Sequence, residues 1–386
     1  MLKGKVGAQL KQGWWQFFVL LLLLVVIVFA LSFWLHQFQR YRSVQRHGWK
    51  FVLRHILQAQ LSDLGRASLA FSPDGQLLAV TENNGAVKVW NVFDGKLVAT
   101  LHPFPHRFVP RYLQPRGLCL SFSPDGQWLA VGYSDDVVRV FDLVNGKIKM
   151  QLGKPCPSGF GSGVQTVAFS PNGKFLTMGI NGKVIIWRVE DGKRVKTLQT
   201  SHSSIAFSPN GKWFVTGGDK GVNLWQIDGW KLLRHLPKSG FIKLAFSKDD
   251  RRLMMVGWGW AEVWDIAKGS RLSFIQPRSK FPRDAAFSPD GELVAITDTR
   301  WIDWIGWLQR RISNLHLPKI LNPFAKLEPH RSGITIWRLS DGKQFAQLMR
   351  GIKWLPIGVS FSPDGQFVAI GYELGGVAIW ELKRIQ

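Results

Sequence analysis

Short apolar runs alternate with turn-forming residues along most of the chain and define a unit of four predicted strands. In the first clear unit, residues 68–71 and 76–80 are strand-like and flank a Ser-Pro-Asp-Gly turn. Pro presets φ and Gly supplies a positive φ, so this sequence favours a tight turn. Residues 86–90 alternate as a half-buried strand does, and an Asp-Gly turn then leads into a fourth strand over residues 97–101.

The four-strand unit recurs at a spacing of about 40 residues, which is typical of propeller blades. Each copy contains the pattern apolar-x-Phe-Ser-Pro-(Asp/Asn)-Gly, which is degraded in the fifth copy. The Phe residues of the seven copies are Phe71, Phe122, Phe169, Phe207, Phe246, Phe287 and Phe361. An aromatic residue follows each Phe after 18 or 19 residues, except in the sixth copy, where it follows after 50. These repeat-defining aromatics are Trp90, Phe141, Trp187, Trp225, Trp264, Trp337 and Trp380.

The repeat resembles the WD-repeat family, in the style of bacterial members rich in FSPDG turns. The family's Trp-Asp pair is present as Trp264-Asp265 and, with Phe in place of Trp, as Phe141-Asp142. The resemblance covers residues 49–386 and implies an all-β fold, a seven-bladed β-propeller. The family's Gly-His pair is missing from every copy. The family's buried Asp-His-Ser/Thr-Trp hydrogen-bond network is therefore expected to be largely absent.

The seventh copy ends too early to form its own fourth strand. Near the N-terminus, residues 48–57 are similar to the fourth-strand segment 229–236. We therefore expect residues 50–57 to pair with residues 377–380 and close the ring, as is common in the family that the repeat resembles. Such closure removes exposed sheet edges. The closing strand is expected to enter from the face opposite the long loops.

A long apolar segment predicts a transmembrane helix over residues 14–36, preceded by a short basic tail over residues 1–13. Residues 14–35 carry no charge. A helix of that length spans about 33 Å, which matches the hydrocarbon core of a bilayer. The aromatic residues at its two ends, which favour the membrane interface, are Trp14, Trp15 and Trp34. The alternatives are a buried core helix and a cleaved signal peptide, for which the apolar run is too long.

Basic residues flank this predicted helix on both sides. The positive-inside rule, by which Lys and Arg gather on the cytoplasmic side, therefore discriminates poorly between the two orientations. The C-terminal flank is slightly richer in Lys and Arg, and the short N-terminal tail is easy to translocate. We expect a single-pass protein of a bacterial inner membrane. A juxtamembrane linker over residues 37–48 would then lead to a cytoplasmic propeller.

The chain has 50 Lys and Arg against 26 Asp and Glu, which gives a formal net charge of +24. This excess predicts attraction to polyanions, although basic residues that only keep the surface soluble are an alternative. His102 and His106 are separated by prolines and cannot share a helical face, and most of the repeat turns contain one Asp. No motif indicates an enzyme. We expect no catalytic residues, no cofactor, no metal and no small-molecule substrate.

Three stretches depart from the repeat: residues 102–112, residues 153–163 and an insertion over residues 300–331 in blade six. In the family that the repeat resembles, all three would lie on one face. Residues 301–315 place apolar side chains on one face of a predicted helix, with arginines off that face. This helix fits a partner groove or a membrane surface, and a cap over the propeller itself is an equal alternative. The candidate partner-binding residues are Trp301, Trp304, Ile305, Leu308, Arg310, Arg311, Arg107 and Arg111.

These features together predict a membrane-anchored scaffold that mediates protein–protein interactions through its loop-rich face. Its partners would be unidentified proteins and, through the N-terminal helix, the lipid bilayer. The alternative is a polyanion-binding module that uses basic and aromatic loops to hold nucleic acid or an anionic lipid headgroup.

Overall fold

The computed structural model describes thirteen stretches of the chain. They are residues 43–46, 49–59, 61, 68–103, 115–156, 161–199, 204–218, 220–237, 241–277, 282–298, 333–348, 355–373 and 376–384. The predicted tail over 1–13 and the predicted transmembrane helix over 14–36 lie outside these stretches. Within them, no helix is both long enough and apolar enough to cross a membrane.

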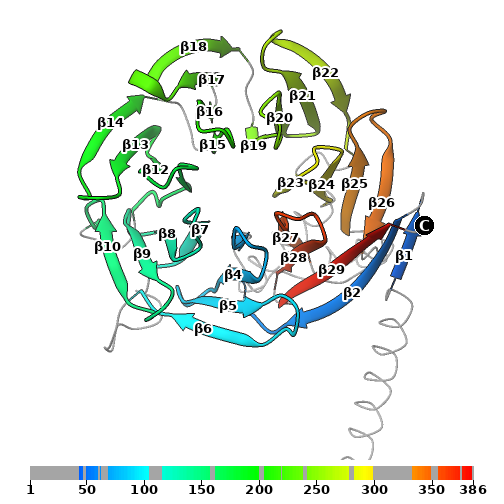
Figure 1. Ribbon diagram of the computed structural model, residues 1–386, viewed down its shortest axis with the longest axis horizontal. Coiled ribbons are helices and arrows are strands. Elements are labelled where there is room, and N and C mark those ends of the chain that lie inside the picture. The colour runs from blue at the N-terminus through cyan, green and yellow to red at the C-terminus, as the bar shows by residue number, and fades with distance from the viewer. Residues whose placement is uncertain are drawn as a thin grey trace, which may run out of the picture.

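Seven antiparallel sheets stand around a central axis and form a seven-bladed propeller, as the repeat predicts (Figure 1). Blade one consists of β3 (Leu69–Phe71), β4 (Leu77–Thr81), β5 (Val87–Asn91) and β6 (Leu97–Leu101). Blade two consists of β7 (Gly117–Phe122), β8 (Trp128–Tyr133), β9 (Val138–Asp142) and β10 (Ile148–Leu152). Blade three consists of β11 (Thr166–Phe169), β12 (Phe175–Ile180), β13 (Lys183–Arg188) and β14 (Arg194–Gln199). Blade four consists of β15 (Ser204–Phe207), β16 (Trp213–Gly218), β17 (Gly221–Gln226) and β18 (Lys231–Leu236), and the 3-10 turn η2 (Asp228–Trp230) precedes β18.

The remaining three blades complete the ring. Blade five consists of β19 (Phe241–Phe246), β20 (Arg252–Gly257), β21 (Trp260–Asp265) and β22 (Ser270–Ile275). Blade six consists of β23 (Ala285–Phe287), β24 (Leu293–Asp298), β25 (Gly333–Arg338) and β26 (Gln344–Leu348). Blade seven has five strands: β27 (Pro356–Phe361), β28 (Phe367–Tyr372), β29 (Gly376–Arg384), β2 (Trp49–Leu57) and β1 (Ser43–Arg46).

The Ser-Pro-Asp-Gly sequence forms the turn between the first and second strands of a blade. In blade one, the amide of Leu77 donates to Ser72 Oγ at 2.9 Å, and Ser72 Oγ donates to Asp74 Oδ1 at 2.5 Å. Gly75 follows with a φ of 73°, in the left-handed region that glycine adopts most readily. The second strands that these turns position are the most buried, and all six residues of β28 are buried. Burial on both faces of the blades gives the ring its core.

The chain closes the ring through its N-terminal segment, and this confirms the sequence-based prediction. Strand β2 pairs antiparallel with β29, from Trp49 opposite Arg384 to Leu57 opposite Val377. Arg54 Nε donates to Glu381 Oε2 at 2.5 Å across this pair. Burial raises the pKa of the Glu381 carboxyl, but the hydrogen bond and the charge of Arg54 outweigh it and hold that pKa below its ordinary value.

One further strand precedes the closing strand and reverses the direction in which the chain arrives. It falls within residues 37–48, which the sequence analysis assigned to a linker: Ser43–Arg46 form β1 and pair antiparallel with β2. The physical reason is that β2 alone would leave an unpaired sheet edge at the rim. Strand β2 does begin at the face that the sequence analysis expected. Strand β1 runs the opposite way, so Ser43 lies nearer than Arg46 to the face that carries the connections from blade to blade.

The strands β1 and β2 also cover the outer strand of blade six. Strand β1 contacts β26, and the rings of Phe51 and Phe345 meet edge to face at 6.2 Å. Phe51 is fully buried in a cluster that includes Trp380 of blade seven and Ile336 of blade six. The N-terminal segment therefore stabilises two blades at once.

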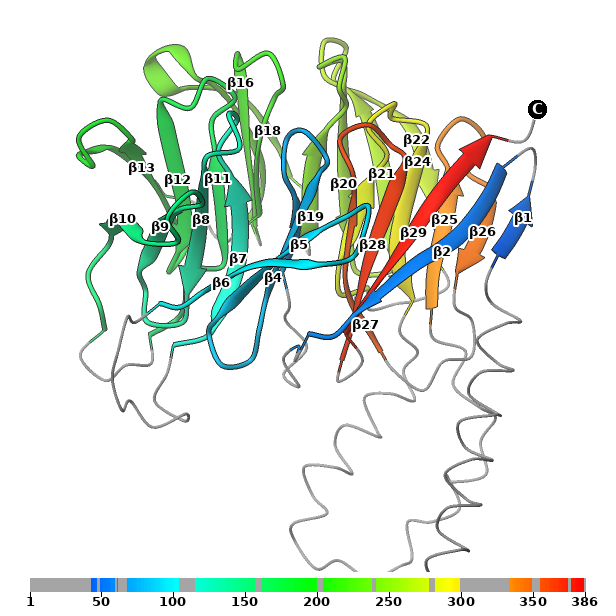
Figure 2. The same ribbon diagram turned by 60° about the horizontal axis from the view of Figure 1, so that its bottom comes forward.

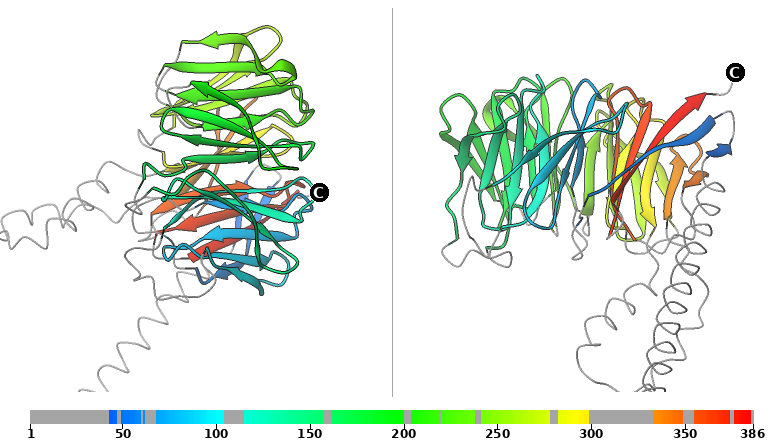
Figure 3. Two further views of the ribbon diagram at one scale, coloured as in Figure 1. Left: turned by 90° about the vertical axis from the view of Figure 1, so that its left-hand side faces the viewer. Right: turned by 90° about the horizontal axis from the view of Figure 1, so that it is seen from below.

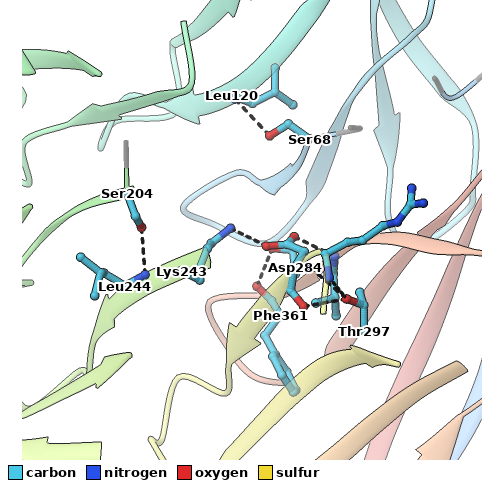
Figure 4. A network of polar contacts seen from close by, with 11 residues as sticks. Ser68, Leu120, Ser204, Lys243, Leu244, Asp284, Thr297 and Phe361 are labelled. Carbon is cyan, nitrogen blue, oxygen red and sulfur yellow. Dashed lines mark hydrogen bonds and ion pairs between the residues drawn. The ribbon is translucent and has the colours of Figure 1, made fainter. Parts of the chain in front are cut away.

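Side chains at the innermost strands connect several blades to the next (Figure 4). Ser68 Oγ accepts the amide of Leu120 at 3.1 Å, and Ser204 Oγ accepts the amide of Leu244 at 3.0 Å. Both serines lie three residues before the repeat Phe of their blade. They satisfy amides at the inner edges of the sheets, where no further strand pairs.

Asp284 occupies the same repeat position in blade six and connects three blades. Its carboxylate accepts Lys243 Nζ of blade five at 3.0 Å and the amide of Val359 of blade seven at 3.1 Å. Its own amide donates to Thr297 Oγ1 at 2.9 Å. Figure 4 shows Lys243 and Thr297 reaching Asp284 from opposite sides.

Replacing Phe51 by alanine is expected to destabilise the whole propeller by about 3–5 kcal/mol, because the change leaves a cavity in a core that two blades share. Urea unfolding of the detergent-solubilised chain, followed by circular dichroism, measures this loss. Phe274→Ala is the matched control, since Phe274 also lies on a fourth strand but is 47% exposed. Its cost should stay within about 0.5 kcal/mol. Equal costs for the two variants would contradict the role given to β2.

Replacing Asp284 by alanine is expected to cost about 1–3 kcal/mol, because the amide of Val359 and the ammonium of Lys243 lose their acceptor. Asp284→Asn keeps an acceptor for Val359 and should lose clearly less stability. The same unfolding measurement separates the two variants. Similar losses for both would show that the hydrogen bond to the next blade contributes little.

Candidate interaction faces

The ring has two faces that differ in the connections they carry (Figure 2). We call the first the turn face: it carries the turns between the first and second strands and between the third and fourth strands. We call the second the interblade face: it carries the turns between the second and third strands and the connections from blade to blade. Edge-on views show that the C-terminal strand ends on the turn-face side (Figure 3).

The exposed carboxylates of the described residues all lie on the turn face. They belong to the Ser-Pro-Asp-Gly turns and to the turns before the outer strands. These residues are Asp74, Asp94, Asp125, Glu190, Asp191, Asp228, Asp249, Asp290, Glu292, Asp341 and Asp364. Several of them accept amides of their own turn, as Asp94 Oδ1 does from Lys96 at 2.9 Å. Their placement therefore follows from turn chemistry.

The carboxylates of the interblade face are turned inward instead. Glu82 is 5% exposed and pairs with Lys88 Nζ at 2.9 Å. Asp135 is 5% exposed and binds both terminal nitrogens of Arg139, at 3.1 Å and 2.7 Å. Glu373 is also buried. The negative charges of this face are thus partly or largely withdrawn from solvent.

The Asp135–Arg139 pair belongs to a buried cluster at the end of blade two. The Arg139 guanidinium lies 4.8 Å from the ring centroid of Tyr133, which is fully buried. Burial raises the pKa of the Tyr133 hydroxyl well above its ordinary value, and the charge of Arg139 partly offsets this. Asp136 accepts the amide of Gly163 at 2.8 Å and so fixes the connection to blade three. The cluster positions a loop, and a bidentate buried pair is costly to break.

Lysines and one tryptophan are exposed on the interblade face. Lys154, Lys183 and Lys220 lie in its loops and turns and are exposed. Trp258 lies in the turn between β20 and β21 of blade five and is 64% exposed. A large exposed aromatic on the same face as exposed cations is a common feature of binding surfaces. The interblade face therefore combines positive charge with an apolar anchor.

The outer strands present a third kind of surface at the rim. On β18, Leu232 and Leu233 are 46% and 43% exposed, with Lys231 beside them. On β22, Leu272 is 53% exposed and follows Arg271. Exposed basic residues on edge strands discourage edge-to-edge association. The exposed basic residues of the rim can therefore be explained without a binding partner.

The repeat-defining aromatics each lie on the third strand of their blade: Trp90 on β5, Phe141 on β9, Trp187 on β13, Trp225 on β17, Trp264 on β21, Trp337 on β25 and Trp380 on β29. Trp225 Nε1 donates to Thr216 Oγ1 at 3.0 Å, and Trp264 Nε1 donates to Glu262 at 2.8 Å. The other five aromatics include Trp187 and Trp337, whose buried Nε1 atoms have no acceptor among the described residues. This agrees with the expectation that the tryptophan network of the repeat is largely absent.

The blade-six insertion lies between paired strand ends. Asp298 at the end of β24 pairs with Gly333 at the start of β25, so the insertion leaves from the interblade face. Its candidate residues lie outside the described residues: Trp301, Trp304, Ile305, Leu308, Arg310 and Arg311. The same holds for the anchor residues Trp14, Trp15 and Trp34 and for the loop arginines Arg107 and Arg111.

No cluster of His, Cys, Asp and Glu side chains suited to a metal ion occurs in the described part of the chain. Cys119 is buried, and its thiol donates to the carbonyl of Val164 at 3.4 Å, so it acts as a small core residue. Most Asp residues of the repeat turns accept hydrogen bonds within their own turn, as the sequence predicts.

Sequence reasoning missed three features of these faces. Trp258 has a local signal, because Gly-Trp-Gly-Trp interrupts two strands with a turn that contains a large aromatic. The Asp135–Arg139 pair and the Asp284–Lys243 pair have weaker signals. Each partner looks like an ordinary charged residue until the blade geometry brings the two together.

Comparison with known families agrees with the repeat. The family described as "WD domain, G-beta repeat" matches residues 116–142, 153–188 and 192–226. The family described as "Anaphase-promoting complex subunit 4 WD40 domain" matches residues 39–107. The first set covers blades two to four, and the second covers the closing strand and blade one.

Similar proteins share only part of their length with this chain. "Telomerase protein component 1" of Rattus norvegicus is 33% identical over 142 residues, which is 36% of this chain and 5% of that protein. "WD repeat and SOCS box-containing protein 1" of Homo sapiens is 34% identical over 122 residues, 31% of this chain and 26% of that protein. "Protein hir-1" of Neurospora crassa is 28% identical over 158 residues, 34% of this chain and 14% of that protein. With the seven sheets and the repeat turns, these matches identify the ring as a WD-repeat β-propeller.

Proposed function

We propose that the chain is a single-pass membrane protein whose propeller is a scaffold for protein partners, held on the cytoplasmic side of a bacterial inner membrane. WD-repeat propellers serve as protein-interaction scaffolds, and one of the relatives, "WD repeat and SOCS box-containing protein 1", is named for its WD repeat. The apolar segment over residues 14–36 provides the anchor. The interblade face provides the binding face, because it carries the longest departures from the repeat.

The observation that carries this proposal is the direction of β1. Strand β1 begins at Ser43, on the interblade side of Arg46, and the strand ends that hold the blade-six insertion, Asp298 and Gly333, lie at the interblade face. Strand β1 lies beside β26 of blade six, so the two segments arise from neighbouring parts of the ring. A partner bound at the insertion is therefore held close to the anchor.

The partner-binding residues are proposed from the sequence of the insertion and of the connection between blades one and two. Tryptophan and arginine contribute strongly to many protein interfaces because they bury a large area and donate hydrogen bonds. The proposed contacts are Trp301, Trp304, Ile305, Leu308, Arg310, Arg311, Arg107 and Arg111. The propeller acts by holding its partners, and no catalytic step, cofactor or metal is part of the proposal.

A second candidate function is binding of a polyanion, either nucleic acid or an anionic headgroup. The inward-turned carboxylates and exposed lysines of the interblade face favour it. Salt separates the two candidates, because polyanion binding weakens steeply with ionic strength while an interface anchored by aromatics weakens less.

Alkaline carbonate and high salt are expected to leave the protein in the membrane pellet, because neither treatment extracts a spanning helix. A chain deleted for residues 1–36 is the control and should appear in the supernatant. Protease added to sealed inverted vesicles of the inner membrane should digest the propeller. Digestion only in right-side-out spheroplasts would contradict the cytoplasmic placement.

Deleting residues 301–315 is expected to abolish capture of one protein partner from detergent-solubilised membranes while the propeller stays folded. The fold should persist because β24 and β25 already pair at their open ends. Trp301→Ala with Trp304→Ala is the milder variant and should weaken the same capture. A lower melting temperature with all partners retained would show that the insertion only covers the propeller. Loss of capture after nuclease treatment would favour the polyanion function.

A further inference from the structure

We propose that the turn face binds the turn face of a second copy of this chain, so that two rings pair face to face. The inference concerns a face that the proposed function leaves unused. It is carried by the way charge is divided among the turns that join first and second strands, which we call the inner turns. They comprise residues 72–76, 123–127, 170–174, 208–212, 247–252, 288–292 and 362–366.

Neighbouring inner turns lie in contact around most of the ring. The first and second strands lie nearest the central axis, so the turns that join them surround it (Figure 1). A Cβ placed at Gly126 of blade two would lie 3.8 Å from Pro73 Cδ of blade one, and the turns of blades three, seven and one meet the preceding blade in the same way. Between blades four and five, the amide of Asn210 donates to Asp250 Oδ1 at 3.0 Å. The charges of neighbouring turns therefore act as one surface.

Four consecutive inner turns, those of blades six, seven, one and two, contain carboxylates and neither Lys nor Arg, and we call them the acidic arc. Their exposed carboxylates are Asp290, Glu292, Asp364, Asp74 and Asp125. At the blade-two end of the arc, the charge of Lys149 offsets part of the charge of Asp125. The rest of the arc is negative throughout.

The inner turns of blades three, four and five carry the opposite charge, and we call them the basic arc. In blades three and four the turn sequence is Ser-Pro-Asn-Gly-Lys, where blades one, two and seven have Ser-Pro-Asp-Gly-Gln. The exposed cations of the arc are Lys174, Lys212, Lys248, Arg251 and Arg252. Asp249 and Asp250 share the turn of blade five, which is still positive overall.

The turns between third and fourth strands do not share this division. In each of blades one to six such a turn combines acidic and basic residues, as in blade one, where Lys96 Nζ lies 3.4 Å from Asp94 Oδ2. The separation of charge is therefore specific to the ring of inner turns.

A face with an acidic half and a basic half is complementary to itself. When two copies meet about a two-fold axis that runs between the faces and along the boundary of the arcs, each acidic arc lies over the basic arc of the other copy. Such an isologous contact forms every favourable pair twice. Opposite charges arranged in this way fix the register in which two surfaces meet, because other registers bring like charges together.

The same contact would cover apolar side chains of the turn face. Phe93 is 60% exposed and Val144 is 88% exposed, and they lie in the turns before the outer strands of blades one and two. Pro73 and Pro124 are exposed in the inner turns of the same two blades. Covering these side chains removes apolar surface from water and favours association.

The test measures the mass of the full chain in detergent micelles by analytical ultracentrifugation. We expect a dimer at low ionic strength and a monomer in about 1 M salt, where charges are screened beyond about 3 Å. A monomer at low ionic strength overturns the inference. A dimer that persists in high salt overturns it as well, because it would be held by the anchor or by another surface.

Two variants exchange turn sequences that the chain already uses, so both are expected to fold. The amide of Lys174 donates to Asn172 Oδ1 at 3.0 Å, as the amide of Gln76 does to Asp74 Oδ1 at 3.0 Å. The first variant gives blades one and seven the basic turn sequence through Asp74→Asn, Gln76→Lys, Asp364→Asn and Gln366→Lys. The second gives blades three and four the acidic turn sequence through Asn172→Asp, Lys174→Gln, Asn210→Asp and Lys212→Gln.

Each variant alone should be monomeric at low ionic strength, with a melting temperature like that of the parent. An equimolar mixture should form dimers again, because one partner then offers mainly positive and the other mainly negative inner turns. A variant that still forms dimers by itself, or a mixture of folded variants that stays monomeric, overturns the inference.

The matched control changes charge on the other face. Lys154→Glu with Lys183→Glu alters the net charge as much as the second variant does but acts on the interblade face. This control should remain dimeric at low ionic strength. A monomeric control would show that net charge governs association, and would overturn the assignment to the two arcs.

Discussion

The pairing of β2 with β29 is the constraint on which the rest of the molecule depends. A propeller is stable only as a closed ring, and this ring closes between segments that lie at opposite ends of the described chain. Closure leaves β2 with one free edge at the rim, and β1 covers that edge. Because β1 runs antiparallel to β2, covering the edge also reverses the direction of the chain at the rim.

Most of the fold could be predicted from the sequence because each blade repeats its turn chemistry. Ser72, Asp74 and Gly75 form the same hydrogen-bonded turn that their spacing predicts, and the equivalent residues do so in the other intact copies. The closing strand was also predictable, since the missing last strand required a substitute and residues 48–57 resemble a fourth strand.

Strand β1 could not be predicted, because it consists of only four residues. Ser43–Arg46 have no clear strand pattern, and they form a strand only because β2 offers an unpaired edge. Trp258 was missed for a related reason. Its exposure depends on a turn position that periodicity does not distinguish from a core position. The connecting role of Asp284 depends on contacts across three blades, which no local pattern encodes.

The two faces of the ring thus differ in a way that follows from turn chemistry. Aspartates that build the strand turns gather on the turn face, where exposed lysines and arginines accompany them, whereas Glu82, Asp135 and Glu373 of the interblade face are buried.

The central claim, that the pairing of β2 with β29 holds the ring closed, is tested most directly by urea unfolding of a chain deleted for residues 43–57, compared with the full chain. The account predicts that the deletion destabilises the whole propeller, because blade seven loses its two outer strands and the ring opens. Unchanged stability after the deletion would contradict it.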